Sequence, residues 1–204
     1  MHTTANIFSV KIDRFILTDI DNDMLVNHAL DTRNGRTFNW KGGYGDFDKF
    51  GGYKESLPED NNNLLLSCNK FKSLYSIIED KLNQVYHVSY NFHYKLKISH
   101  SWCSVNNEPA ITIPHNHKRS VLSAVYYPQA NDEELWFINP MPQMVGSIQP
   151  QHVANLDEYN RDYVSIKVNT GELLIFNSML HHYIKPTEKQ RISFATDSTI
   201  ENNR

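Results

Sequence analysis

Histidines are the residues of this sequence whose spacing could support metal chemistry. The chain has ten of them, and His115 and His117 lie two residues apart at the end of a segment that begins at Ala110 and reads as a β-strand. Because side chains alternate between the two faces of a strand, these two point the same way, roughly 7 Å apart at the backbone. Both imidazoles can therefore converge on one ion.

A third imidazole is available further along the chain. His181 and His182 follow residues 172–176, which also read as a strand, across a short connection. With His115 and His117 they give a His-x-His pair plus a distant histidine, and such nitrogen ligands suit iron(II), zinc, copper or nickel. A His-x-His pair is also common at the surface of histidine-rich chains, so the interpretation depends on its neighbours.

Arg191 and Ser193 follow shortly after these histidines and again share one face of a predicted strand. A guanidinium offers a two-pronged donor to a carboxylate, and the hydroxyl adds a further donor. The rest of that strand is apolar (Ile192, Phe194 and Ala195), so a buried Arg191 needs a partner. The pattern favours an anionic small ligand, and a structural salt bridge to one of the 23 acidic residues is the alternative.

The elements that must position these residues change character near residue 95. The second half holds seven short segments rich in Ile, Val, Tyr, Phe and Thr, separated or interrupted by turn signals such as Pro114, Pro128 and Asn139-Pro140. Regular short strands of this kind are typical of a sandwich or jelly-roll barrel. The predicted strands are residues 91–102, 110–117, 120–127, 135–139, 163–168, 172–176 and 191–197.

The first half is predicted to be mixed and partly helical. Residues 5–17 alternate as an edge strand would, and residues 21–30 have an acidic start followed by apolar residues at helical spacing. From Lys70 to Val85 apolar residues recur at intervals of three and four, which indicates an amphipathic helix packed on a sheet. Residues 34–58 contain Asn-Gly, two Gly-Gly pairs and a proline, and are predicted to form a loop.

Composition bounds the class of protein. The 204 residues, 40% of them hydrophobic, suffice for a full core without disulfides. Cys68 and Cys103 lack metal-type spacing, which fits a cytoplasmic protein. A net charge of −3 gives no basic field for nucleic acid, and neither a signal peptide nor a membrane span is predicted. We expect one domain over residues 1–204, with residues 1–94 as helical and loop support and residues 95–204 as the jelly-roll core.

Several segments together carry a resemblance to a known family. They are His115-x-His117 followed by Ser120, Leu122, Ser123, Val125, Tyr126 and Tyr127, then residues 176–182, and then Arg191-Ile192-Ser193. In order and spacing they resemble the small 2-oxoglutarate and iron(II)-dependent oxygenases found in marine bacteria and phages. Residues 51–56 and Ser101-Trp102 are similar to earlier landmarks of that family, so the likeness covers most of the chain.

The resemblance implies a mainly β fold, a double-stranded β-helix or jelly roll, with the N-terminal helices packed on one sheet and the metal at the open end. In the family pattern the second histidine of the distal pair is the ligand, which selects His182 over His181. Arg191 and Ser193 match the residues that bind the far carboxylate of 2-oxoglutarate, while its keto and near carboxylate oxygens chelate the iron.

Three residues on the strand after the histidine pair are candidates to line the cosubstrate pocket. They are Ser123, Tyr126 and Tyr127. For the two tyrosines the alternative is a place in the core, because aromatic residues on a strand are more often core residues than ligand contacts.

The third metal ligand departs from the wider superfamily, which presents His-x-Asp or His-x-Glu. Here His117 stands at the carboxylate position, and three neutral imidazoles leave iron(II) more positive than two histidines and a carboxylate. Either His117 is the third ligand, or a carboxylate such as Asp132 or Glu134 completes the set. We favour His117, because position along a strand sets direction more reliably than a loop acid does.

The activity that the resemblance implies is hydroxylation of a C–H bond with dioxygen, coupled to decarboxylation of 2-oxoglutarate to succinate and CO2. The substrate would be a protein side chain or a small molecule, and residues 33–58 and 140–162 are long enough to cover the barrel mouth. The alternatives are a zinc hydrolase or hydratase, in which three histidines acidify a zinc-bound water, and a non-catalytic jelly-roll binding module.

Overall fold

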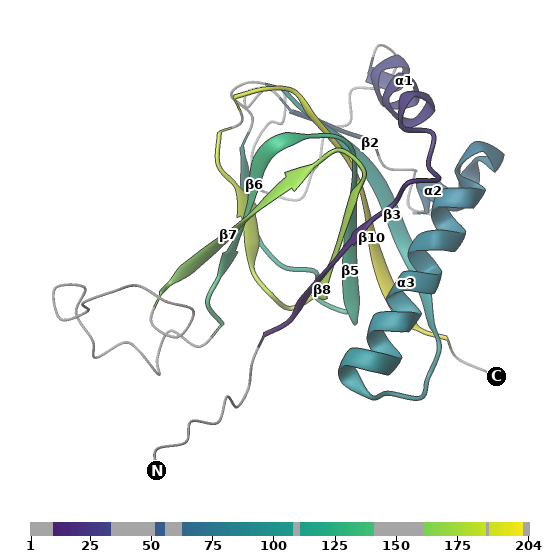
Figure 1. Ribbon diagram of the computed structural model, residues 1–204, viewed down its shortest axis with the longest axis vertical. Coiled ribbons are helices and arrows are strands. Elements are labelled where there is room, and N and C mark those ends of the chain that lie inside the picture. The colour runs from purple at the N-terminus through teal and green to yellow at the C-terminus, as the bar shows by residue number, and fades with distance from the viewer. Residues whose placement is uncertain are drawn as a thin grey trace, which may run out of the picture.

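Two antiparallel sheets face each other in this protein, and helices cover the outer side of the larger sheet (Figure 1). The computed structural model describes residues 10–33, 52–55, 63–107, 111–140, 161–186 and 188–201. This arrangement confirms the predicted jelly roll, or double-stranded β-helix, with N-terminal helices packed on one sheet. Among the described helices none is both long and apolar enough to cross a bilayer.

The larger sheet has six strands, and the last strand of the chain lies near its centre. Their order across the sheet is β1 (Ile12–Ile16), β8 (Glu172–Asn177), β5 (Leu122–Gln129), β10 (Arg191–Ile200), β3 (Leu96–Asn106) and β2 (Gly52–Glu55). β10 therefore has both neighbours, β5 and β3, along its length. Its side chains can reach the interior of the barrel only through the face turned towards the smaller sheet.

The smaller sheet contains two of the three candidate histidine ligands, His115 and His182. Its order is β4 (Thr112–His115), β9 (His182–Ile184), β6 (Asn131–Ile138) and β7 (Tyr163–Asn169). β4 and β9 pair so that His115 lies opposite His182, although the two residues are 67 positions apart in the sequence. This register is what brings two distant histidines to one end of the barrel.

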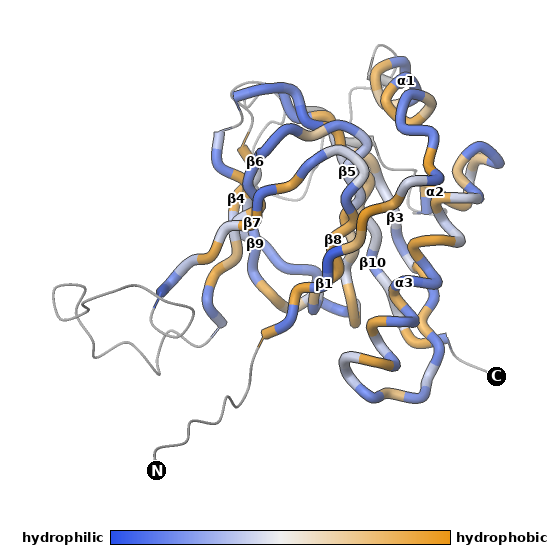
Figure 2. Tube along the Cα trace, viewed as in Figure 1, coloured by the Kyte–Doolittle hydropathy of each residue, from blue (hydrophilic) through white to orange (hydrophobic). Residues whose placement is uncertain are grey.

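Helices from the first half of the chain rest on the larger sheet. They are α1 (Asn22–Arg33), α2 (Leu64–Ser67), the 3₁₀ turn η3 (Asn69–Phe71) and α3 (Lys72–Tyr90). Orange and blue stretches alternate along α3 in Figure 2, and Leu74, Ile78 and Leu82 on its apolar face are buried. Asn91 ends this helix in the left-handed conformation, with its N–H bonded to the Tyr86 carbonyl.

Alternation along the strands of the larger sheet separates two hydrophobic clusters. Ile192 and Phe194 of β10 join the cluster that packs under the helices, together with Leu82 of α3. The cluster between the sheets contains residues such as Phe137 and Phe176. Since neighbouring residues of a strand face opposite ways, Arg191, Ser193, Ala195 and Asp197 are turned towards the space between the sheets.

Two short strands differ from the sequence prediction. Residues 52–55, inside the predicted loop 34–58, form β2 at the edge of the larger sheet, and the other residues of that loop lie outside the described part. β9 has three residues and was not predicted. Strands this short show no readable period of two, so partners elsewhere in the chain define them. The edge strand predicted over residues 5–17 is confirmed as β1, and residues 5–9 of that range lie outside the described part.

The packing of α3 on the larger sheet should contribute several kcal/mol to stability. Leu82→Ala removes a buried side chain, and we expect it to lower the free energy of unfolding by about 2–5 kcal/mol. Val88 lies on the same helix and is 78% exposed, so Val88→Ala should change that free energy by about 0.5 kcal/mol or less. Urea unfolding followed by circular dichroism measures both, and equal losses would contradict this packing.

Candidate metal centre

Three histidines meet between the sheets at one end of the barrel. His115 ends β4, His117 follows two residues later, and His182 begins β9. One ring nitrogen of each lies within 4.8 Å of the others, and Nε2 of His117 is 3.3 Å from Nε2 of His182. Two nitrogens bound about 2.1 Å from one metal ion would be roughly 3.0–3.4 Å apart at octahedral or tetrahedral angles. The His117–His182 distance has this value, and the 4.8 Å limit places His115 within reach of the same ion.

The other nitrogen of each ring is held by an oxygen atom. Carbonyl and carboxylate oxygens accept hydrogen bonds, so the Nδ1 atom that they contact carries the hydrogen in each ring. The lone pair is then on Nε2, which is the tautomer a ligand needs. The three bonds run from Nδ1 of His115 to Ile113 O (2.8 Å), of His182 to Leu180 O (3.0 Å) and of His117 to Asp197 Oδ2 (2.9 Å).

Burial keeps the deepest of these rings neutral. His182 is 5% exposed, and its removal from water, reinforced by His115, lowers its pKa from 6.5 to about 3. A proton therefore does not compete with a metal ion for its Nε2 at neutral pH. Phe176 packs against the ring edge-on, with ring centres 4.9 Å apart, and supplies the apolar wall.

His117 is positioned from two sides although it lies beyond the end of β4. Its ring stacks on Trp102 of β3, with ring centres 5.4 Å apart and planes 13° from parallel. Its backbone N–H donates to the Ser178 carbonyl at 2.8 Å. Together with the bond to Asp197, these contacts fix the direction of Nε2 without a regular strand.

His181 and the two alternative carboxylates lie away from the three histidines. His181 is exposed, and its Nε2 contacts Nδ2 of Asn116 at 3.4 Å. Asp132 and Glu134 line a separate cavity of about 420 Å³ beside the start of β6. Glu134 accepts a hydrogen bond from Ser165 there, and neither acid belongs to the histidine group.

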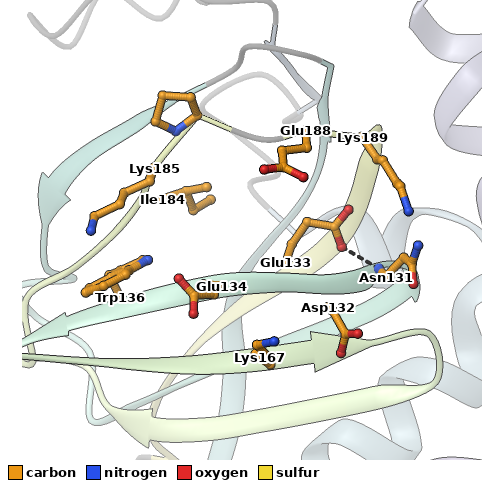
Figure 3. A pocket seen from close by; sticks show the side chains of 11 residues that line it. Asn131, Asp132, Glu133, Glu134, Trp136, Lys167, Ile184, Lys185, Glu188 and Lys189 are labelled. Atoms are coloured by element: carbon orange, nitrogen blue, oxygen red, sulfur yellow. Dashed lines mark hydrogen bonds between the residues drawn. The ribbon is translucent and has the colours of Figure 1, made fainter.

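Figure 3 shows that separate cavity. Trp136 and Glu134 reach it from β6, Lys185 from the end of β9 and Lys167 from β7. The Lys185 ammonium lies 3.3 Å from the centre of the Trp136 ring, in a cation–π contact that covers this face of the indole. Two acids of this cavity are bonded locally, Glu133 to the backbone N–H of Asn131 and Glu134 to the Ser165 hydroxyl.

Arg191 lies buried between the sheets with open donors. It is 1% exposed, and its Nη2 donates to Oδ1 of Asn106 at 3.4 Å. Nε and Nη1 of Arg191 and Nδ2 of Asn106 are buried without a hydrogen-bond partner among the described residues. Buried donors left unpaired are costly, and a carboxylate would satisfy several of them at once.

Burial and two neighbouring residues act on the pKa of Arg191. Burial lowers the pKa of its guanidinium, whereas Tyr127 and Glu133 raise it. Within the described part of the chain Arg191 forms no salt bridge, because the ion pairs there join other residues. Glu133 therefore acts on Arg191 through its charge alone, since among the described residues no carboxylate oxygen lies within 4.0 Å of the Arg191 nitrogens.

Tyr127 and Ser193 lie near this guanidinium. The Tyr127 ring centre is 5.8 Å from the Arg191 guanidinium carbon, and burial raises the pKa of its phenol to about 12. Ser193 is buried two residues after Arg191 on the same face of β10. These three residues, which the sequence singled out separately, share one region between the sheets.

Tyr126 lies elsewhere than expected, and Ser123 contacts Asp197. Tyr126 belongs to the cluster under the helices, and its hydroxyl donates to Oδ1 of Asn22 at 2.6 Å. This placement corrects the expectation that Tyr126 lines the cosubstrate pocket: adjacent residues of β5 face opposite ways, and Tyr127 takes the interior face. The Ser123 hydroxyl donates to Oδ1 of Asp197 at 2.7 Å, and the other oxygen of this carboxylate contacts His117.

Two polar residues of the site were missed by the sequence analysis. Asn106 is the register partner of Arg191 across β3 and β10, a relation that only the sheet topology reveals. Asp197 lies at the end of the strand predicted over 191–197, on the same face as Arg191 and Ser193. Extending the two-residue alternation from Ser193 would have found it.

Comparison with known proteins agrees with this geometry. Residues 100–197 match the family model described as "Putative 2OG-Fe(II) oxygenase", and this range contains all three histidines and Arg191. No curated protein matches the sequence.

Solved structures share the fold. A prolyl-4-hydroxylase from Pseudomonas putida has a TM-score of 0.61 and 10% identity, covering 95% of each chain. A Trichoplax adhaerens prolyl hydroxylase in complex with a hypoxia inducible factor peptide has a TM-score of 0.63 and 13% identity, covering 93% of this chain and 83% of its own. HygX from Streptomyces hygroscopicus, with nickel and 2-oxoglutarate bound, has a TM-score of 0.58 and 12% identity, covering 94% and 83%.

At these identities the structural likeness establishes the double-stranded β-helix fold. The family match points to 2-oxoglutarate and iron(II) chemistry. Residues 100–197, just under half of the chain, match the 2OG-Fe(II) oxygenase family model, and that family and the similar structures are 2-oxoglutarate-dependent non-haem iron oxygenases.

Proposed function

We propose that the protein is a dioxygenase that binds iron(II) through Nε2 of His115, His117 and His182 and hydroxylates a C–H bond of its substrate. The nitrogen spacing and the three tautomers set by Nδ1 bonds support this ligand set. Three ligands from one side of an ion leave room for a chelating cosubstrate and for dioxygen. His117 takes the place that a carboxylate holds in the wider superfamily.

Arg191 is the proposed anchor for the far carboxylate of 2-oxoglutarate. The observation that carries the proposal is the buried guanidinium, whose Nε and Nη1 have no hydrogen-bond partner among the described residues. Ser193 offers a hydroxyl on the same face of β10, and Nδ2 of Asn106 offers a further donor. A zinc hydrolase would need no buried guanidinium beside its metal, so Arg191 favours the oxygenase.

Iron(II) with bound 2-oxoglutarate supplies the activation of dioxygen, and succinate and CO2 are the coproducts. The chain's own residues would hold the metal ion and orient the cosubstrate. The buried rings of Phe176 and Tyr127 exclude water from the space between the sheets, and Arg191 sets the pose of the cosubstrate. The matching experiment is to load the protein with iron(II) and measure succinate formed from 2-oxoglutarate, with zinc(II)-loaded protein as the control.

The substrate of the proposed reaction is a protein side chain or a small molecule. Among the similar structures, one prolyl hydroxylase holds a peptide fragment and HygX has been solved with hygromycin B, so this fold accepts both classes. We propose that residues 33–58 and 140–162 determine the choice, and most of these lie outside the described residues. We propose that residues 1–204 form one domain, in which the first 94 residues also contribute the edge strands β1 and β2.

The distal ligand can be tested by comparing two adjacent histidines. His182→Gln removes a buried imidazole aimed at the centre, and we expect manganese(II) affinity to fall at least about tenfold, because a nitrogen ligand is lost. His181→Gln changes an exposed ring outside the group and should leave affinity within about twofold. Anaerobic calorimetric titration measures both, and the reverse result would assign the ligand to His181.

The role of Arg191 can be tested separately from metal binding. Arg191→Lys keeps the positive charge but loses the two-pronged donor, so we expect 2-oxoglutarate to bind roughly 10- to 100-fold more weakly, or about 1.4–2.8 kcal/mol. Manganese(II) affinity should stay within about twofold, because no Arg191 atom belongs to the histidine group. Titration of 2-oxoglutarate into manganese(II)-loaded protein is the measurement. Wild-type affinity in the variant would remove Arg191 from the site.

A further inference from the structure

A carboxylate stands directly behind the histidine that replaces the usual carboxylate ligand. Oδ2 of Asp197 accepts the Nδ1–H of His117 at 2.9 Å, while Nε2 of the same ring faces Nε2 of His182 at 3.3 Å. The His117 ring therefore separates the Asp197 carboxylate from the converging nitrogens. Asp197 is placed to act on a metal ion through His117 and not as a ligand.

The three histidines differ in this respect. His115 and His182 donate their Nδ1–H to the neutral backbone carbonyls of Ile113 and Leu180. Among the described residues, an anionic group accepts the Nδ1–H of His117 alone of these three rings. A hydrogen bond from an imidazole to a carboxylate increases the electron density at the other ring nitrogen, which makes it a stronger ligand.

The bond to Asp197 would change the net charge around a bound metal ion. Iron(II) with two neutral histidines and one carboxylate carries a net charge of about +1, whereas three neutral histidines leave about +2. Adding the Asp197 carboxylate behind His117 brings the total back to about +1, with the negative charge one ring further out. The negative charge that is lost when histidine replaces a carboxylate ligand is thus restored by Asp197, which contacts the ligand and not the metal ion.

Asp197 is itself held in place for this role. It is 8% exposed, and its second oxygen, Oδ1, accepts the Ser123 hydroxyl at 2.7 Å. Ser123 in turn bonds to the Ser178 hydroxyl at 2.9 Å, and the Ser178 carbonyl accepts the backbone N–H of His117. The hydrogen-bonded loop closes on the same histidine, so the carboxylate and the ring are positioned as one unit.

The sheet geometry aims Asp197 at this point. The pairing of β10 with β3 shifts register between Asp197 and Ser198, and such bulges redirect side chains next to functional sites. Trp102 stacks on a face of the His117 ring. The imidazole can therefore move little when its Nδ1 partner is changed.

We propose that Asp197 is a positioning residue that supplies, through His117, the negative charge that the three-histidine centre lacks. This inference rests on the proposed function, because it requires His117 to be a metal ligand. It predicts that the carboxylate strengthens metal binding and stabilises the ferric state relative to the ferrous state. It also explains how histidine can occupy the carboxylate position while the net charge of the metal centre, counted with Asp197, stays the same.

The test is to remove the charge while keeping the shape. Asp197→Asn should weaken manganese(II) binding to the protein roughly 10- to 100-fold, raise the iron(III)/iron(II) potential and shift the visible absorption of cobalt(II)-loaded protein. Glu172→Gln is the matched control, because Glu172 is also a buried carboxylate, 8% exposed, but is held by Arg14 and the Asn169 N–H. It should leave all three measurements unchanged. Where Asp197→Asn does not fold, the smaller uncharged Asp197→Ser takes its place.

The outcomes separate this inference from the proposed function. If His117→Gln loses manganese(II) affinity while Asp197→Asn keeps wild-type affinity, potential and spectrum, His117 is a ligand but Asp197 supplies nothing through it, and the inference is overturned. If His117→Gln keeps wild-type affinity, the ligand set itself is wrong and the inference is overturned with it. Loss in both variants, with Glu172→Gln unchanged, supports both.

Discussion

The structure depends on three hydrogen bonds that hold imidazole rings by their Nδ1 atoms. Two end on backbone carbonyls and one on Asp197, and together they leave three Nε2 lone pairs close enough to share one ion. Neutral rings so close together are tolerable because burial keeps His182 unprotonated. The jelly roll supplies this arrangement by pairing β4 with β9, which places His115 opposite His182.

One strand serves both parts of the site. The apolar residues of β10, Ile192 and Phe194, anchor it against the helices, while the residues between them face the other sheet. Arg191 stands at one end of this polar row with open donors, and Asp197 stands at the other end behind His117. A displacement of β10 would therefore disturb the proposed cosubstrate anchor and the candidate metal centre together.

Much of this could be predicted from the sequence where the signal is local. The two-residue spacing of His115 and His117, and of Arg191 and Ser193, already indicated shared faces, and the periodicity from Lys70 to Val85 indicated α3. What could not be predicted depends on pairing between distant strands. Asn106 meets Arg191 only through register, and β2 and β9 are too short to show a period. Tyr126 and Tyr127 could be separated only once one face of β5 was known to carry helices.

The most direct test of the central claim is a crystal structure grown anaerobically with manganese(II) and 2-oxoglutarate. The account predicts Nε2 of His115, His117 and His182 at about 2.0–2.2 Å from the metal ion, with the far carboxylate of 2-oxoglutarate on Arg191. A carboxylate side chain in the coordination sphere in place of His117 would contradict the three-histidine centre. A cosubstrate bound away from Arg191 would contradict the proposed anchor.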